Sequence, residues 1–224
     1  EERTRKTAIE AIGQLGGSAP MTFDIDEGDF AALLASEPVD GPSAVDEREI
    51  CLMLYTSGTT GRPKGVPRSH RAERLAGTHN VATFSYRYGE STLGVMPMFH
   101  TMGVRAILMM AVVNGKLVCL PTWDAETAMG IVEREKLTVL YLVPTMFHDM
   151  LHHAKRGDYD LSSVRNISYA GMSMTSALSE LSVREFAPDH FLNFYGSSEV
   201  YCFAVCDHVT EKPGCAGRPG IGQM

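Results

Sequence analysis

Residues 55–66 hold the densest group of potential ligand-binding residues in the chain, directly after the apolar stretch 50–54. The segment reads Tyr-Thr-Ser-Gly-Thr-Thr-Gly-Arg-Pro-Lys-Gly-Val. Glycines allow backbone N–H groups to approach an anion, hydroxyls add donors, and a lysine adds a positive charge. This combination suits a polyphosphate. The residues that we expect to contact it are Thr56, Ser57, Gly58, Thr59, Thr60, Gly61 and Lys64.

Two other interpretations of this segment are weaker. The Walker phosphate loop needs Gly-Lys-Ser/Thr in succession, whereas Lys64 follows Pro63 and precedes Gly65. A flexible Gly/Thr surface loop would not require such a density of phosphate-binding groups. We therefore prefer a phosphate-binding loop that differs from the Walker type.

Three later segments repeat the combination of glycine with chemically useful side chains. Residues 97–103 read Pro-Met-Phe-His-Thr-Met-Gly, residues 193–199 read Asn-Phe-Tyr-Gly-Ser-Ser-Glu, and residues 214–219 read Gly-Cys-Ala-Gly-Arg-Pro. With the segment at 55–66, these resemble, in the same order, four motifs of the adenylate-forming superfamily. That superfamily contains acyl-CoA synthetases, the adenylation domains of peptide synthetases and luciferases. Ser198 stands where the family usually has threonine and keeps the hydroxyl.

The resemblance implies an adenylation reaction, in which a carboxylate attacks the α-phosphorus of ATP and expels pyrophosphate. Two anions must meet, so the site needs a metal and fixed donors. By resemblance Glu199 would hold Mg²⁺, Ser198 would bond the α-phosphate, and His100 would lie beside the carboxylate. An ordinary surface glutamate is the alternative for Glu199. The catalytic residues implied are His100, Lys64, Ser198 and Glu199.

The adenine is expected near the ends of two later segments. Tyr195 offers an aromatic face for stacking, although a buried core tyrosine is the alternative. By resemblance, the turn at Gly171 and Met172 lies against the adenine and the acyl group. The remaining nucleotide-binding residues implied by the motifs are Asn193 and Gly196.

The acyl group is indicated by a second, narrower resemblance. Residues 65–73, 143–145 and 169–174 look most like the benzoate- and chlorobenzoate-CoA ligases. Methionines and a tyrosine would form an apolar slot for a flat ring or a medium acyl chain. The pocket residues that follow from this are His100, Met102, Met172, Val200 and Tyr201.

The composition is that of an ordinary globular protein: the 224 residues are 44% hydrophobic and 21% charged. The net charge of −7 argues against nucleic acid or an anionic membrane surface as the main partner. The five cysteines contain no Cys-x-x-Cys pair, which favours free thiols in a reducing cytoplasm. No apolar run approaches the length of a membrane helix, and no signal peptide is evident.

From about residue 50 the sequence alternates apolar runs with helical patterns, which predicts a mostly parallel β-sheet flanked by helices. The segment 139–143 is apolar throughout, as expected of a strand covered on both faces. Asp124 is a plausible N-cap for a helix that ends near Lys136. Helices are also expected at 104–113 and 174–186. Strands are expected at 50–55, 92–96, 116–120, 139–143, 166–170 and 190–194.

Since ligands of open α/β sheets bind at the carboxyl ends of the strands, the loops that follow these strands should meet at one edge. Residues 56–64, 97–103, 171–173 and 195–199 all follow predicted strands. His148, His152 and His153 have helical spacing but no evident third metal ligand, so we assign them to a polar helix face.

The four motifs fall within residues 48–224, the expected core of a large N-terminal AMP-binding domain. Residues 1–47 would be a remnant of the upstream region, with a helical start, a Gly16-Gly17 break and a short helix around 30–35. By resemblance, the family's ribose-binding aspartate, hinge and C-terminal lid domain with its lysine follow the last motif and are absent from this chain. We therefore expect a fragment that is inactive alone.

The preferred function is that of an AMP-forming acyl-CoA synthetase, a ligase that uses ATP, Mg²⁺ and CoA. Its partners would be a small carboxylate and the two cosubstrates. Two alternatives stay open: an adenylation domain that loads a carrier protein, and a nucleotide-binding module without catalysis. The presence of Lys64, His100 and Glu199 speaks against the second.

Overall fold

The computed structural model describes residues 2–21, 28–38, 41, 44–57 and 61–220. The chain forms two compact units, Glu1–Ala44 and Val45–Met224. The described part of the first unit is helical. It contains α1 (Glu2–Gln14), the 3-10 helix η1 (Gly16–Ser18) and α2 (Gly28–Leu34). The expected break at Gly16-Gly17 separates the two longer helices.

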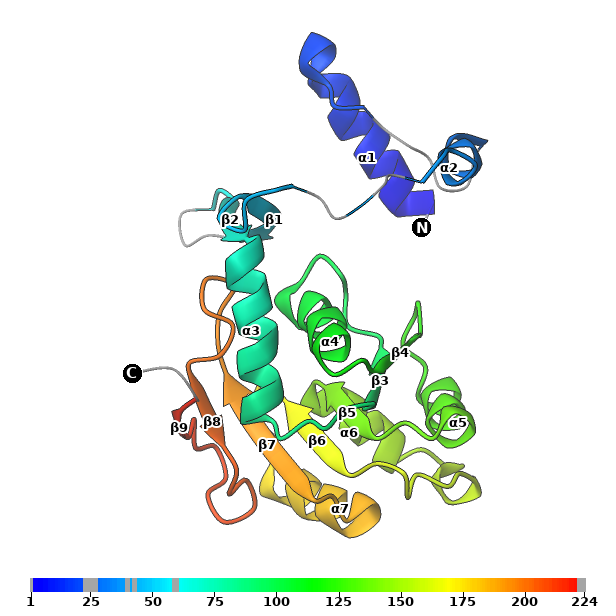
Figure 1. Cartoon of the computed structure of the whole chain (residues 1–224). Helices are drawn as coiled ribbons and strands as arrows, with labels where there is room; N and C mark the ends of the chain where they lie inside the picture. Colours follow the sequence, from blue (N-terminus) through cyan, green and yellow to red (C-terminus); the bar gives the residue numbers. More distant parts are fainter. Residues whose placement is uncertain (1, 22–27, 39–40, 42–43, 58–60, 221–224) are drawn as a thin grey trace. The chain divides into compact units, whose positions relative to one another are not determined.

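The second unit contains a seven-stranded sheet within the described residues, in the order β4-β3-β5-β6-β7-β8-β9 (Figure 1). Five neighbouring strands are parallel, and the last two extend the sheet in the antiparallel sense. The predicted α/β fold with a mostly parallel sheet is confirmed. The strands are β3 (Ser91–Gly94), β4 (Lys116–Cys119), β5 (Val139–Leu142), β6 (Asn166–Tyr169), β7 (His190–Tyr195), β8 (Ala204–Cys206) and β9 (Arg218–Pro219).

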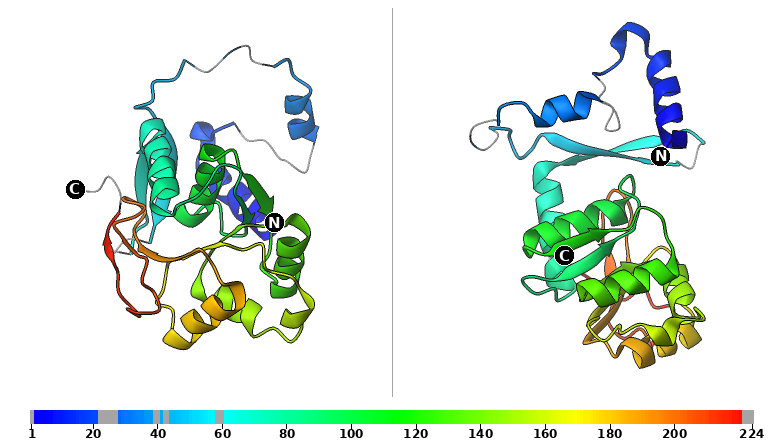
Figure 2. Two further views of the ribbon diagram at one scale, coloured as in Figure 1. Left: turned by 60° about the horizontal axis from the view of Figure 1, so that its bottom comes forward. Right: turned by 90° about the vertical axis from the view of Figure 1, so that its right-hand side faces the viewer.

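Helices cover both faces of this sheet (Figures 1 and 2). In β5, Leu140 and Leu142 belong to one hydrophobic core, whereas Val139 and Tyr141 belong to the other. All four residues are fully buried, as the apolar run predicts for a strand covered on both faces. The first core includes α5 (Ala125–Glu135), α6 (Pro144–Leu151) and α7 (Ser176–Phe186), and the second includes α4 (Thr101–Val112).

The predicted helix after Asp124 is confirmed in detail. The Asp124 carboxylate accepts a hydrogen bond from the backbone N–H of Thr127 at 2.8 Å, which satisfies a free donor of the first turn. Lys136 ends the helix in the left-handed conformation, with φ of 50°. Across the described residues, we find no helix whose length and apolar character would allow it to cross a membrane.

One strand expected in the parallel sheet lies elsewhere. β1 (Ile50–Thr56) pairs antiparallel with β2 (Lys64–Ser69) in a separate two-stranded sheet, and β2 leads directly into α3 (His70–Thr83) (Figure 1). Leu54 is buried, whereas Ile50 and Tyr55 are 61% and 69% exposed. A short apolar run shows no clear alternation, so periodicity does not reveal whether the strand lies in a covered sheet or in a partly exposed hairpin. The expectation that residues 56–64 follow a strand of the parallel sheet is therefore wrong.

Candidate active site

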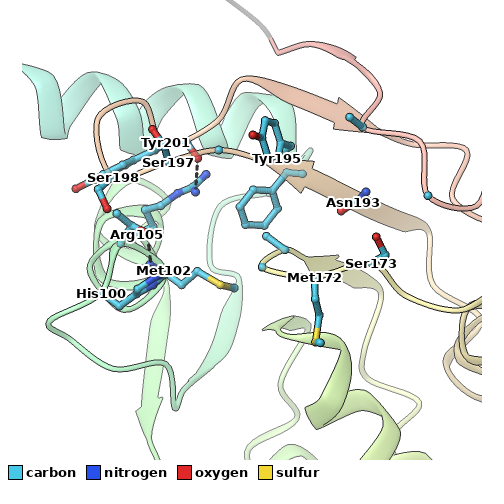
Figure 3. A pocket seen from close by; sticks show the side chains of 17 residues that line it. His100, Met102, Arg105, Met172, Ser173, Asn193, Tyr195, Ser197, Ser198 and Tyr201 are labelled. Atoms are coloured by element: carbon cyan, nitrogen blue, oxygen red, sulfur yellow. Dashed lines mark hydrogen bonds between the residues drawn. The ribbon is translucent and has the colours of Figure 1, made fainter. Parts of the chain in front are cut away.

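A cavity of about 440 Å³ is lined by segments that follow β3, β6 and β7 (Figure 3). Three parallel strands thus contribute to it from their carboxyl ends, the usual position of a ligand site in an open α/β sheet. A volume of this size is within the range of small-molecule pockets. The predicted site residues that line the cavity are His100, Met102, Gly171, Met172, Asn193, Tyr195, Gly196, Ser198 and Tyr201.

The other predicted residues lie outside this lining. Glu199 and Val200 continue the turn after Ser198, and Val200 bonds back to Ser197 rather than lining the cavity. Gly58, Thr59 and Thr60 lie outside the described residues. Thr56 pairs with Lys64 across the β1–β2 hairpin, and neither they nor Ser57 and Gly61 are among the lining residues described.

His100 forms the N-cap of α4. Its Nδ1 accepts a hydrogen bond from the backbone N–H of Met102 at 3.2 Å. A neutral imidazole that accepts at Nδ1 carries its proton on Nε2, so the second ring nitrogen is a donor. His100 lines the cavity and is labelled beside Met102 in Figure 3. The residue therefore combines a helix cap with a hydrogen-bond donor at the cavity wall.

Gly103 allows the loop that contains His100 to pack closely against the first turn of α4. A Cβ added at this position would lie 2.2 Å from the carbonyl oxygen of Pro97. The backbone of the loop therefore rests directly on the first turn of α4. His100 closes the same turn, because its N–H donates to the Pro97 carbonyl at 3.0 Å.

The turn after β7 is folded tightly on itself. A Cβ added at Gly196 would lie 1.9 Å from the carbonyl oxygen of Tyr201. The N–H of Ser197 donates to the Val200 carbonyl at 2.9 Å, and the N–H of Phe203 donates to the Tyr195 carbonyl at 2.7 Å. Glycine at position 196 thus allows the closed turn that carries Ser198 and Glu199.

The charge of Glu199 is favoured by its surroundings. Hydrogen bonding from the side chain of Ser197 is the largest cause that lowers the pKa of Glu199, followed by the bond from its own backbone N–H. The positive charge of Lys64 lowers that pKa further. The exposed carboxylate therefore stays ionised at neutral pH and lies within electrostatic reach of the lysine of the proposed phosphate loop.

Tyr195 is 61% exposed, so the alternative of a buried core tyrosine is wrong. Its ring lies 5.7 Å from that of Phe203 and lines the cavity. Asn193 donates from Nδ2 to the Cys215 carbonyl at 3.1 Å, which holds the last motif segment beside the cavity. Gly214 and Ala216 of that segment are lining residues.

Ser197 and Arg105 belong to the cavity wall but were not among the predicted site residues. Arg105 could have been recognised from the sequence as unusual, because it is the one charged residue in the apolar segment 101–113. Ser197 lies inside a motif, but its bond to the Glu199 carboxylate depends on how the turn folds. The fold of this turn is set by contacts with residues that are far away in the sequence.

His148 on α6 and His152 at its C-cap form a polar surface, in agreement with their assignment from the sequence, whereas His153 lies after the end of the helix. His148 and His152 stack with ring centroids 4.2 Å apart and are exposed. In the portion of the chain that the structure describes, no cluster of three His, Cys, Asp or Glu side chains could hold a metal ion.

The family model for AMP-binding enzymes matches residues 4–223 of this chain. The 4-chlorobenzoate–CoA ligase of Pseudomonas sp. (strain CBS-3) is 30% identical over 70% of this chain and 30% of its own length. A feruloyl-CoA synthase of Amycolatopsis sp. is 31% identical over 83% of this chain and 38% of its own length. The chain thus spans about a third of the length of these relatives.

A fatty acyl CoA synthetase of Mycobacterium tuberculosis has a similar fold. The two structures superpose with a TM-score of 0.85 over 96% of this chain and 43% of that chain. The sequence identity is 22%, so this similarity supports the fold alone.

Proposed function

This chain belongs to the family of AMP-binding enzymes, and we propose that it is part of an AMP-forming acyl-CoA synthetase that acts in the cytoplasm. Its substrates would be an aryl or medium acyl carboxylic acid, ATP and CoA. The observation that carries the proposal is the cavity. It gathers residues from three motif segments, and the ionised Glu199 next to it lies within reach of the Lys64 charge.

Two steps make up the proposed reaction. In the first, a carboxylate oxygen attacks the α-phosphorus of ATP, the bond to the β-phosphate breaks, and pyrophosphate leaves. In the second, the CoA thiol loses its proton to solvent and attacks the acyl carbonyl. AMP then leaves with one of the original carboxylate oxygens, and acyl-CoA is released.

The residues of the chain would act chiefly by holding the reactants. The Nε2 donor of His100 suits a carboxylate at the cavity wall. The exposed ring of Tyr195 provides a stacking face for adenine. Ser198 presents a hydroxyl to the α-phosphate, and Lys64 adds positive charge where the phosphates would lie.

A magnesium ion would fit Glu199. Mg²⁺ commonly takes one or two protein carboxylates and completes its shell with phosphate oxygens and water, so no larger cluster is needed. The Glu199 carboxylate is exposed and its pKa is lowered, as a ligand that must be ionised requires. When bound, the ion would neutralise charge on the phosphates.

The acyl group would lie between Met102, in the first turn of α4, and Met172, in the turn after β6, which both line the cavity (Figure 3). Met102 is buried, and Met172 is 52% exposed. Methionine adapts to irregular apolar shapes, which suits a flat ring or a short chain. The described lining contains no acidic side chain, and Arg105 adds a positive charge.

We expect benzoate-type acids to support carboxylate-dependent pyrophosphate exchange better than amino acids do. An α-ammonium group would meet no acidic partner in the described lining, and burial of an unpaired charge is costly. The measurement is the rate of exchange between pyrophosphate and ATP for a panel of acids with the complete protein. A ranking led by an amino acid would instead favour a peptide-synthetase adenylation domain.

The His100→Ser and His100→Ala variants are expected to differ from each other in stability but to lose catalytic activity to the same extent. Serine can still cap α4, whereas alanine should cost about 1 kcal/mol in free energy of unfolding. Both variants lose the Nε2 donor, so the kcat/KM for the carboxylate should fall about tenfold or more in each. Thermal unfolding and pyrophosphate release measure the two effects. A wild-type kcat/KM in the serine variant would exclude contact between His100 and the carboxylate.

A further inference from the structure

Three charged side chains lie buried beneath the turn that carries Ser198 and Glu199. Arg68 from β2 is 9% exposed, Glu73 from the first turn of α3 is 5% exposed, and Arg105 from α4 is 2% exposed. Buried charges are costly unless they are paired and hydrogen-bonded. The groups to which these three side chains bond therefore indicate which part of the chain they hold in place.

Both arginines donate to backbone carbonyls of the same short segment. Nη1 of Arg68 donates to the carbonyl oxygen of Glu199 at 2.7 Å. Nη1 of Arg105 donates to the carbonyl oxygen of Tyr201 at 2.7 Å. The Tyr201 carbonyl is also the group that leaves no room for a side chain at Gly196. Two guanidinium groups thus fix the second half of the turn.

Glu73 joins Arg68 to the same segment. One carboxylate oxygen accepts from Nε of Arg68 at 2.5 Å, and the other accepts from the Tyr201 hydroxyl at 2.8 Å. The Arg68 guanidinium also lies 4.1 Å from the centre of the Tyr201 ring. Arg68, Glu73 and Tyr201 therefore each contact the other two.

Arg105 is held from its other side. Nη2 donates to Oδ1 of Asn80 on α3 at 2.9 Å, and the guanidinium lies 4.6 Å from the centre of the Phe194 ring. A planar guanidinium with fixed donors loses little freedom when it forms further bonds. The turn is thereby attached to α3, α4 and β2, elements far from it in the sequence.

We propose that Arg68, Glu73 and Arg105 are positioning residues for adenylation. They hold the backbone of residues 199–201 so that the Ser198 hydroxyl and the Glu199 carboxylate face the phosphates without rearrangement. The inference rests on the proposed function of this site. Its physical basis is that catalysis by charge stabilisation depends on groups already fixed in place.

Tyr201→Phe in the complete protein tests the proposal, with Tyr86→Phe as the matched control. Each change removes one buried tyrosine hydroxyl. The Tyr86 hydroxyl lies 3.0 Å from Oγ of Ser168, and no described hydrogen bond joins it to Arg68, Glu73 or the turn. We expect similar losses of thermal stability in both variants. Only Tyr201→Phe should slow adenylation, by about 10- to 100-fold, and raise the Mg²⁺ concentration needed for half-maximal rate.

Glu73→Gln provides a second variant, because Glu73 is not among the residues that line the cavity. It should reproduce the kinetic effect of Tyr201→Phe; if it does not fold, Tyr201→Phe decides alone. Equal kinetic constants for Tyr201→Phe and Tyr86→Phe would show that the contacts support only stability, and would overturn the proposal.

Hydrogen exchange tests whether the network holds the turn, independently of the proposed function. Faster exchange of backbone amides in residues 197–203 is expected for Tyr201→Phe but not for Tyr86→Phe, whatever reaction the site performs. If the wild-type protein released no pyrophosphate with any acid, the proposed function would fail. The exchange result would still decide whether the network holds the turn, and unchanged exchange would contradict it.

Discussion

Glu199→Gln is expected to reduce the rate of acyl-adenylate formation by about 10²–10³-fold or more while leaving the fold intact. Removal of one fixed group that stabilises transition-state charge has effects of this size. Glutamine keeps the shape of the exposed side chain but lacks the ionised carboxylate that Mg²⁺ prefers. The measurement is carboxylate-dependent pyrophosphate release by the complete protein over a range of Mg²⁺ concentrations.

Glu180→Gln is the matched control for this experiment. Glu180 is exposed on α7 and does not line the cavity, so its substitution should leave the rate unchanged. Pyrophosphate release at the wild-type rate in Glu199→Gln would exclude the proposed role as a metal ligand, and Glu199 would then be an ordinary surface residue.

Gly196→Ala is expected to be the most damaging single-methyl change in the site. The added Cβ would lie 1.9 Å from the Tyr201 carbonyl oxygen, so the turn must open. Forced overpacking typically costs about 1–3 kcal/mol in free energy of unfolding. Displacement of Ser198 and Glu199 by about 1 Å can lower the rate about 100-fold. Thermal unfolding and pyrophosphate release together measure the two effects.

Gly157→Ala provides the comparison. A Cβ added at Gly157 meets nothing within 4 Å, so this variant should keep both the stability and the rate of the wild type. If Gly196→Ala behaved in the same way, the close packing of the turn would have no part in the reaction.

The sequence was not sufficient to predict β8 and β9, but it was sufficient to predict the five parallel strands, because these alternate with helices and the central one is apolar on both faces. The segment 139–143 shows this directly, since β5 contributes alternate residues to two cores. The strand at 50–55 could not be placed in the same way. Its apolar residues look buried in the sequence, but they form one side of a hairpin whose second strand, residues 64–69, has no apolar run.

The cavity was largely predictable from the motifs, whereas the groups that hold its turn were not. Arg68 and Glu199, and likewise Glu73 and Tyr201, meet across more than a hundred residues of chain. No local pattern specifies such contacts, because they depend on how α3 and β2 pack against the turn that follows β7. An isolated charge within an apolar helix, as at Arg105, is the one local sign that a buried polar partner exists.

Isotope transfer tests the central claim most directly. The acid that ranks first in pyrophosphate exchange is labelled with heavy oxygen in its carboxylate and incubated with the complete protein, ATP and CoA. The proposed reaction predicts AMP that carries one heavy oxygen atom, because the carboxylate oxygen that attacks the α-phosphorus leaves with AMP. Unlabelled AMP, or label in orthophosphate from formation of ADP, would contradict adenylation at this site.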